Sequence, residues 1–317
     1  MIRTQGKVAV YGEVWFDEEP PAEAGVDILV HRYRSTPIPQ VRTVTATTLR
    51  TDLARPMDEI MATFDATCRR EIRRADSRDD LYYELIPEAV DRLEEFTTFY
   101  EEFARQKGLS LTDRHWLGRA ATAHQLVLSH SYRHSEQLVW HAYVCIGATA
   151  CLTHSASWLR ARDSRYRSLV GRANRWLHWQ DMLSFKRAGV RYYDWGGMFR
   201  DESTGDHAGI NQFKRMFGGR PVRTYECTVP VSARGRIWLA LRDAWRGWPF
   251  RRDLFCEISD EERARMAAVV PIDLRNVRHA SDKGCDDLPK DQEPAGPAVA
   301  ARAQQARKHS QVPWHPR

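Results

Sequence analysis

The chain has 317 residues, 42% of them hydrophobic and 28% charged, the ordinary composition of a globular protein with room for one large domain or two small ones. Its 48 Lys and Arg against 42 Asp and Glu give a formal charge of +6, which suits anionic partners such as nucleotides, tRNA or acidic lipid surfaces without requiring any of them. No apolar run reaches the roughly 18 residues of a membrane-spanning helix, so none is predicted.

Neither the amino terminus nor the cysteines indicate export. The chain carries no signal-peptide pattern near its start, and its 6 cysteines form no Cys-x-x-Cys pair. We therefore expect a cytoplasmic protein, peripheral to the inner face of a membrane at most, whose cysteines are reduced and packed in its core.

The first 50 residues predict strands. Residues 7–16, 26–33 and 42–48 are rich in β-branched and aromatic side chains, and prolines separate them. We expect these strands to join the sheet edge of a core domain formed by residues 51–255.

An arginine-rich helix is predicted over residues 57–75. Its apolar face is formed by residues four apart: Ile60, Phe64, Cys68 and Ile72. Its last turns carry four arginines: Arg69, Arg70, Arg73 and Arg74. These are either a solvated face, favoured by the helix dipole, or a phosphate clamp, because guanidinium groups match phosphate oxygens. In the second case we expect Arg73 to border the acceptor cleft.

The middle of the chain predicts central strands and the helices that cover them. Residues 81–86 form a strand, Pro87 opens a helix that ends at Gly108, and residues 113–123 form another helix. Residues 125–130 and 138–145 are strands, and Gly147 turns the second into residues 148–155. His130 and His134 stand four apart without a neighbouring carboxylate, so we expect surface histidines and no metal site.

A positively charged loop precedes the next predicted helix. Residues 158–170 contain arginines at 160, 162, 165 and 167, and Asn174 is a suitable N-cap for a helix over residues 175–188. A helix N-terminus presents free N–H groups and a partial positive charge to anions. We therefore expect a donor phosphate near four residues: Arg165, Arg167, Arg172 and Asn174. The alternative is a mobile, solvated loop.

Two glycine pairs end predicted elements in the following segment. Residues 190–195 predict a buried strand that ends at Gly196-Gly197, and a polar loop leads to a short helix over residues 209–217. Gly218-Gly219 stops that helix before a strand over residues 221–229. Glycines at a strand end let a substrate approach the backbone, which favours a transferase cleft bordered by Gly196 and Gly197. Alternatively, these glycines only make turns.

The order of these residues resembles a known signature. Asp194-Trp195-Gly196-Gly197, Gly209-Ile210, Phe213-Lys214 and Phe217-Gly218-Gly219 are similar to the strand end and helix of the Fem peptidyltransferases, which belong to the GNAT-type acyltransferase superfamily. Residues 68–75 resemble the arginine-rich helix that precedes their central domain. The resemblance runs roughly from residue 57 to 229 and implies an α/β (α+β) GNAT-like acyltransferase fold, a mixed central sheet flanked by helices. Fem enzymes usually carry two such domains, whereas this chain has the length for one with extensions.

The resemblance also implies site residues. It assigns Lys214 to the reacting ester, where an ammonium suits the oxyanion that develops when an amine attacks a carbonyl. We expect Phe213 to wall the cleft and Asp194 to take the amine proton, although an aspartate at a turn also hydrogen-bonds backbone N–H groups. No Ser-His-Asp or Cys-His arrangement is evident. We expect no bound cofactor, because the donor, acyl-CoA or aminoacyl-tRNA, is itself a substrate.

Beyond this region, residues 236–246 predict a helix with Trp238, Leu241 and Trp245 on one face. Trp248, Arg251 and Arg252 follow. The segment is either packed on its own domain or an interfacial helix at an anionic membrane. Residues 256–280 form an extension, and the composition of residues 281–317 predicts a disordered tail.

Two functions stay open at this point. The leading expectation is an N-acyltransferase or aminoacyltransferase that forms an amide on a cell-envelope or secondary-metabolite precursor. Its acceptor is a small molecule or is linked to a lipid or nucleotide. The alternative is a non-catalytic GNAT-like module that binds a nucleotide-linked glycan or a partner protein in an envelope polysaccharide assembly complex. The oligomeric state does not follow from the sequence.

Overall fold

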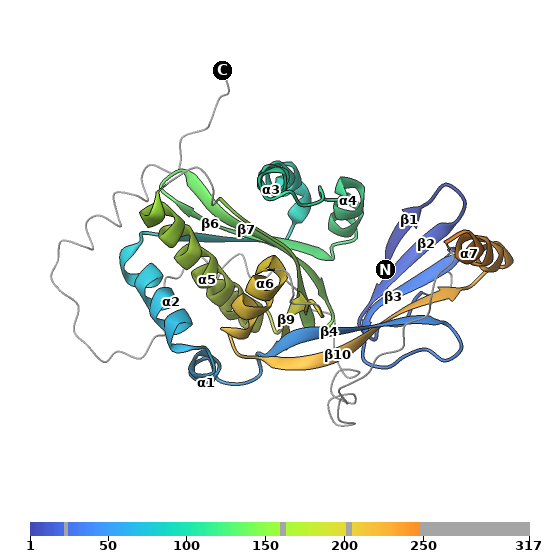
Figure 1. Cartoon of the computed structure of the whole chain (residues 1–317), viewed down its shortest axis with the longest axis horizontal. Coiled ribbons are helices and arrows are strands. Elements are labelled where there is room, and N and C mark those ends of the chain that lie inside the picture. The colour runs from blue at the N-terminus through green and yellow to red at the C-terminus, as the bar shows by residue number, and fades with distance from the viewer. Residues whose placement is uncertain (22–24, 159–162, 201–204, 247–317) are drawn as a thin grey trace, which may run out of the picture. The chain divides into compact units, whose positions relative to one another are not determined.

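Ten strands form one mixed sheet in the part of the chain that the computed structural model describes, residues 1–21, 25–158, 163–200 and 205–246 (Figure 1). The strands are β1 (Ile2–Gln5), β2 (Val10–Trp15), β3 (Ile28–Arg34), β4 (Arg42–Asp52), β5 (Tyr82–Ile86), β6 (Leu126–Arg133), β7 (Glu136–Ile146), β8 (Thr149–Ser157), β9 (Tyr192–Gly197) and β10 (Arg220–Pro230). Their order in the sheet is β1-β2-β3-β10-β4-β9-β8-β7-β6-β5. Neighbours are antiparallel except for β2 with β3 and β8 with β9.

Helices cover both faces of this sheet. They are α1 (Met57–Ala62), α2 (Ala66–Arg78), α3 (Leu93–Lys107), α4 (Arg114–Thr122), α5 (Ser164–Arg187), α6 (Gly205–Arg215) and α7 (Ala233–Arg246), with a short 3-10 helix over Ala89–Arg92. Figure 1 shows α1, α2, α5 and α6 on one face and α3 and α4 on the other. Phe64, Trp176 and Phe217 belong to the core on the first face, and Phe96 and Trp140 to the core on the second. The predicted α/β fold, a mixed sheet flanked by helices, is confirmed.

The strands of the first 50 residues are part of the same sheet. The expected domain boundary at residue 50 falls inside β4, which pairs with both β9 and β10. All described residues lie in one compact unit, Met1–Ser281. The expected extension and tail, residues 256–317, lie outside the described residues. None of the helices in the described ranges has the length and apolar character needed to cross a membrane.

The single helix predicted over residues 57–75 is wrong, because it is two helices. α1 ends at Ala62, and Asp65 caps α2 by accepting a hydrogen bond from the backbone N–H of Cys68 at 2.5 Å. The apolar residues four apart nevertheless remain buried in one core. A strong N-cap residue at position 65 is the local signal for this break.

The helix predicted to begin after Asn174 is also misplaced. α5 begins at Ser164, where Asp163 accepts a hydrogen bond from the backbone N–H of Tyr166 at 2.9 Å, so Asn174 lies in the middle of the helix. Leu169, Val170 and Ala173 are buried in a core cluster of their own. Burial of this apolar stripe outweighs the weak helix propensity of the glycine and asparagine in the segment.

The histidines of the β6–β7 hairpin differ from each other. His134 is exposed in the turn, as expected, but the expectation that His130 lies on the surface is wrong. Its ring stacks on Trp140 with centroids 4.2 Å apart, and Nε2 lies 2.6 Å from a carboxylate oxygen of Glu84. That hydrogen bond lowers the pKa of Glu84.

The helix expected near residue 240 is present as α7. Trp238 is half-buried, and its indole N–H donates to the hydroxyl of Tyr11 on β2 at 2.6 Å. Ile237 and Leu241 are instead 62% and 61% exposed. Leu241 therefore faces solvent, whereas Trp238 is partly covered. Residues 247–252 lie outside the described residues, and membrane contact of this segment stays a prediction.

Burial of His154 on β8 makes stability depend on pH. Its ring packs edge-on against Phe96 and Tyr100 of α3, and burial lowers the pKa of His154 from 6.5 to about 4. As the pH falls, the unfolded chain therefore binds a proton before the folded chain does. The contribution of this group to stability is fully present above pH 6.5 and is lost between pH 6.5 and about 4.

We expect the unfolding free energy of the wild type to fall by about 1–3 kcal/mol more than that of a His154→Gln variant when the pH is lowered from about 7 to 4.5. Burial also lowers the pKa values of His31 and His178. Both histidines are present in both proteins, so their contributions to the pH dependence cancel in the comparison. Urea unfolding at each pH measures the difference. A His115→Gln variant, which changes an exposed histidine of α4, is the control and should follow the wild type. Equal pH dependence in the wild type and His154→Gln would contradict this account.

Candidate active site

The central feature of the candidate site is the point where the parallel strands β8 and β9 separate. They pair through Thr149 with Tyr192, Ala150 with Tyr193 and Cys151 with Asp194, and then diverge. A cavity of about 1000 Å³ begins there, and the next residues of both strands line it. The cavity is also lined by residues of α5, α6, α3 and α4 and, at its other end, of β2, β3 and β10.

Asp194 holds β9 toward β4 at this separation. Its carboxylate is fully buried, and Oδ2 accepts hydrogen bonds from Arg50 Nη2 at 3.1 Å, from Arg50 Nε at 3.2 Å and from Thr48 Oγ1 at 3.1 Å. Oδ1 accepts a hydrogen bond from the backbone N–H of Gly196 at 2.9 Å. Asp194 does not line the cavity, so its predicted role in taking the amine proton is wrong. The carboxylate instead shapes the strand end that borders the cavity.

Gly196 is required by this geometry. Its φ is +71°, and a Cβ at this position would lie 2.7 Å from the backbone oxygen of Leu152 on β8. A side chain would therefore push the two strand ends apart. Both Gly196 and Gly197 line the cavity, as the sequence predicted.

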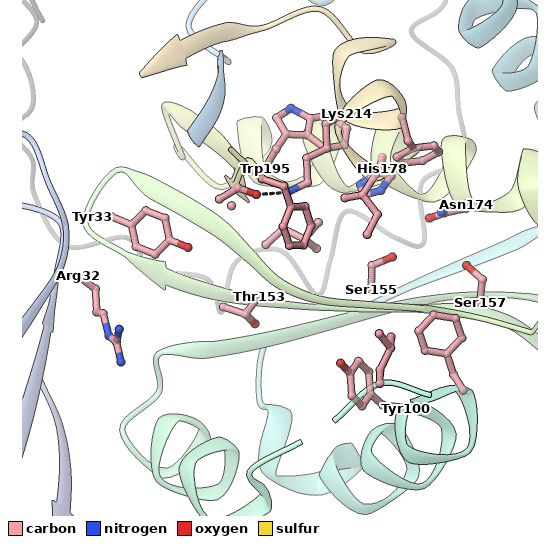
Figure 2. A pocket seen from close by; sticks show the side chains of 18 of the residues that line it. Arg32, Tyr33, Tyr100, Thr153, Ser155, Ser157, Asn174, His178, Trp195 and Lys214 are labelled. Carbon is pink, nitrogen blue, oxygen red and sulfur yellow. Dashed lines mark hydrogen bonds between the residues drawn. The ribbon is translucent and has the colours of Figure 1, made fainter. Parts of the chain in front are cut away.

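Lys214 of α6 faces the same cavity. Its ammonium donates a hydrogen bond to the backbone oxygen of Gly197 at 2.7 Å, as the dashed line in Figure 2 marks. Burial lowers the pKa of Lys214, and the negative charge of Asp194 opposes that effect. Phe213, the preceding residue, also lines the cavity, and the guanidinium carbon of Arg175 lies 5.3 Å from its ring centroid. The structure therefore places the predicted Phe213-Lys214 pair on the cavity wall.

The predicted phosphate site at a helix N-terminus is wrong. Arg172 lies inside α5 and pairs with buried Asp79, with Nε 2.6 Å from Oδ2 and Nη2 3.0 Å from Oδ1. Arg165 and Arg167 are exposed near the start of α5, and Arg73 is exposed on α2; these three do not line the cavity. Asn174 does line it, but from the middle of the helix.

A buried polar network behind the cavity was not predicted. Tyr143 donates to Asp181 Oδ2 at 2.6 Å, its hydroxyl lies 2.7 Å from that of Tyr193, and the latter lies 2.7 Å from His178 Nδ1. His141 Nδ1 lies 2.8 Å from Asp181 Oδ2. Asn174, His178 and Asp181 recur at helical spacing on α5, next to the apolar residues that the helix buries, and this polar stripe is the signal that sequence reasoning missed.

The same network holds a group of metal-ligand type. Ligand atoms of His141, His178 and Asp181 lie within 4.8 Å of one another. Each of these side chains is engaged by hydrogen bonds within the network, and His141 Nε2 lies 2.9 Å from Asn174 Oδ1. Asp181 Oδ1 is buried without a hydrogen-bond partner in the described part of the chain, so the network is not fully satisfied, and we assign no ion to it.

The opposite end of the cavity is acidic and aromatic. Arg32 Nη1 lies 2.9 Å from a carboxylate oxygen of Glu226, and Nη2 lies 3.5 Å from one of Glu13. The indole N–H of Trp116 donates to the other oxygen of Glu13 at 3.0 Å. Two carboxylates and one guanidinium leave this end with excess negative charge. It suits an ammonium or a neutral polar group better than a phosphate.

Comparison with known proteins gives fold likenesses of low identity. Neither a protein-family model nor a curated protein matches this chain. Similar solved structures include FemX, with 13% identity over 62% of this chain and a TM-score of 0.49; the chain spans 63% of the length of FemX. They also include L-PGS from Bacillus licheniformis, at 11% identity over 76% of this chain and 84% of that one, with a TM-score of 0.44. A putative GNAT-family acetyltransferase from Novosphingobium aromaticivorans is 12% identical over 63% of this chain and 72% of that one, with a TM-score of 0.32.

We expect an Arg172→Met variant to lose stability and not donor affinity. Removing the guanidinium leaves Asp79 as a buried, uncompensated charge, which costs about 3–5 kcal/mol. Chemical unfolding measures this loss. Arg165→Met, which changes an exposed arginine of the same helix, should stay within about 0.5 kcal/mol of the wild type. A stable Arg172→Met protein with weakened donor binding would restore the phosphate-binding role.

Proposed function

We propose that this protein is an N-acyltransferase or aminoacyltransferase that forms an amide on the amine of a cell-envelope or secondary-metabolite precursor. The observation that carries the proposal is the position of Lys214, whose ammonium lies on the cavity wall beside the strand-end glycines Gly196 and Gly197. The resemblance of these residues to the Fem signature supports the same chemistry.

The proposed reaction needs charge stabilisation and alignment. An amine attacks the activated carbonyl carbon, and negative charge develops on the carbonyl oxygen. An ammonium has three N–H donors, and Lys214 uses one for Gly197 O, which leaves the others for that oxygen. The hydrogen bond to a backbone atom also holds the ammonium in place, so little reorganisation is needed when charge develops.

The cavity suits a substrate that has one part able to pack against aromatic rings and another part that is polar. Trp15, Tyr33 and Tyr100 line the cavity. The carboxylates of Glu13 and Glu226 pair with Arg32, which Figure 2 shows away from Lys214. A small-molecule acceptor, or the amine-bearing part of a lipid- or nucleotide-linked acceptor, fits this distribution. A phosphate held inside the cavity does not.

Lys214→Met is the direct test. We expect turnover to fall about 100- to 1,000-fold, equivalent to about 2.7–4 kcal/mol of barrier, because one oxyanion donor is lost. Folding should be nearly unchanged, since the side chain is half-buried and contacts a single strand end. Lys214→Arg should restore little activity, because a planar guanidinium places its charge differently. Release of product from an acyl-CoA or aminoacyl-tRNA donor in the presence of candidate amines measures the rate.

Gln212→Met, a change at an exposed position of the same helix, is the matched control and should keep full activity. Full activity in Lys214→Met would refute the proposed role. Donor binding without any turnover in the wild type would favour the alternative, a non-catalytic GNAT-like module.

The donor class can be tested on the arginines of α2. Arg70, Arg74 and Arg78 recur at steps of four and are exposed, so they form one basic stripe, and Arg73 is exposed beside them. A tRNA donor would neutralise these charges with its backbone phosphates, releasing counterions.

If the donor is aminoacyl-tRNA, a double variant with Arg74→Ala and Arg78→Ala should bind tRNA more weakly. The slope of the logarithm of the affinity against the logarithm of the salt concentration should fall in magnitude by about 2. Fluorescence anisotropy of labelled tRNA measures both. Arg105→Ala on α3, which covers the other face of the sheet, is the control. An unchanged slope in the double variant would favour acyl-CoA.

A further inference from the structure

His178 presents one ring nitrogen to the cavity and buries the other. The ring is 1% exposed and packs against Trp195 and Phe213, with centroids 4.6 and 5.7 Å apart. It nevertheless lines the cavity together with Lys214, and Figure 2 shows both along one side of it, opposite Tyr100. Nδ1 lies 2.7 Å from the hydroxyl of Tyr193. Nε2 forms no hydrogen bond within the described part of the chain, and it is not among the fully buried side-chain atoms that lack a partner.

The hydrogen bonds behind His178 run in one direction. A carboxylate only accepts hydrogen bonds, so the hydroxyl of Tyr143 donates to Asp181 at 2.6 Å. The oxygen of Tyr143 can then accept a hydrogen bond from the Tyr193 hydroxyl, 2.7 Å away. With its proton directed to Tyr143, Tyr193 accepts from Nδ1–H of His178. This order makes Nε2, which faces the cavity, the unprotonated nitrogen of the imidazole.

The surroundings of His178 keep its ring neutral. Burial lowers the pKa of His178 well below its ordinary value. His141 on β7, Lys214 on α6 and Arg175 on α5 act in the same direction, in that order. Tyr193 on β9 supplies the acceptor for Nδ1–H, and Asp181 ends the chain of hydrogen bonds. A neutral imidazole is ready to accept a proton, and the charge it then carries is stabilised along that chain.

We propose that His178 is the proton acceptor for the attacking amine, through Nε2, with Tyr193, Tyr143 and Asp181 as positioning residues behind it. This proposal rests on the proposed acyl transfer. In the step, the amine nitrogen bonds to the carbonyl carbon, and the bond from that carbon to the ester oxygen or thioester sulfur breaks with its electron pair on the leaving group. The amine proton passes to Nε2 and from there to the leaving group.

The tautomer of His178 tests the arrangement without any substrate. Long-range proton–nitrogen NMR spectra of protein with ¹⁵N-labelled histidine distinguish Nδ1–H from Nε2–H, and the His178→Gln variant assigns the signal. We expect Nδ1–H in the wild type and a shift toward Nε2–H in Tyr193→Phe, which removes the acceptor. Tyr192→Phe is the matched control, because the ring of Tyr192 faces the guanidinium groups of Arg50 and Arg191. An Nε2–H tautomer in the wild type overturns the proposal.

Kinetics test the catalytic role separately. We expect His178→Gln to lower kcat about 100- to 10,000-fold with a smaller change in KM. Tyr193→Phe should retain part of the activity and move the acid limb of the pH–rate profile to lower pH, because the imidazolium loses its hydrogen-bonded stabilisation. If Lys214→Met abolishes turnover while His178→Gln keeps the wild-type kcat and pH profile, the proposed function stands and this proposal fails. If wild-type protein with the Nδ1–H tautomer turns over no donor, the proposed function fails and the catalytic role of His178 fails with it.

Discussion

The buried ion pair between Asp194 and Arg50 is the interaction on which the candidate site depends. A buried carboxylate is tolerated when its oxygens are filled by donors, and here Arg50, Thr48 and the backbone of Gly196 fill them. The contacts with Arg50 and Thr48 draw β9 toward β4 at the residue where its pairing with β8 ends, whereas the contact with Gly196 lies within β9. The separation of β8 from β9, and with it the cavity, therefore depends on the ion pair.

The two ends of the cavity differ in charge. At the β9 side, Lys214 offers positive charge beside glycine backbone, and His178 offers an unpaired ring nitrogen. At the other end, Glu13 and Glu226 surround Arg32 and leave an excess of negative charge. Under the proposed function, such a distribution would orient a substrate with its electrophilic carbonyl near α6 and its polar or cationic end near β2 and β3.

The helix α5 connects the fold to this chemistry. Its apolar residues build the core, while Arg172 is paired with Asp79, and Asn174, His178 and Asp181 face a shared polar network. Each of these polar side chains has a hydrogen-bond partner outside α5, so the network forms only when the sheet and helix are assembled. Buried networks of this kind are costly when incomplete, and they hold the groups near the cavity in one arrangement.

Local pattern in the sequence determined most of the strands, the helix end at Gly108 and the glycine turn at Gly196. These features rest on backbone conformation and periodicity, which neighbouring residues control. The position of Phe213 and Lys214 beside a cleft was predicted from the resemblance of their motif to the Fem signature. Only the tertiary structure decided the start of α5, the pairing of Arg172 with Asp79 and the burial of Asp194 and His178. Those outcomes depend on residues distant in the chain, since Arg172 and Asp79 are 93 positions apart and Arg50 and Asp194 are 144. An arginine or histidine has the same local pattern whether it binds a substrate or a buried partner, and burial, which folding sets, decides between them.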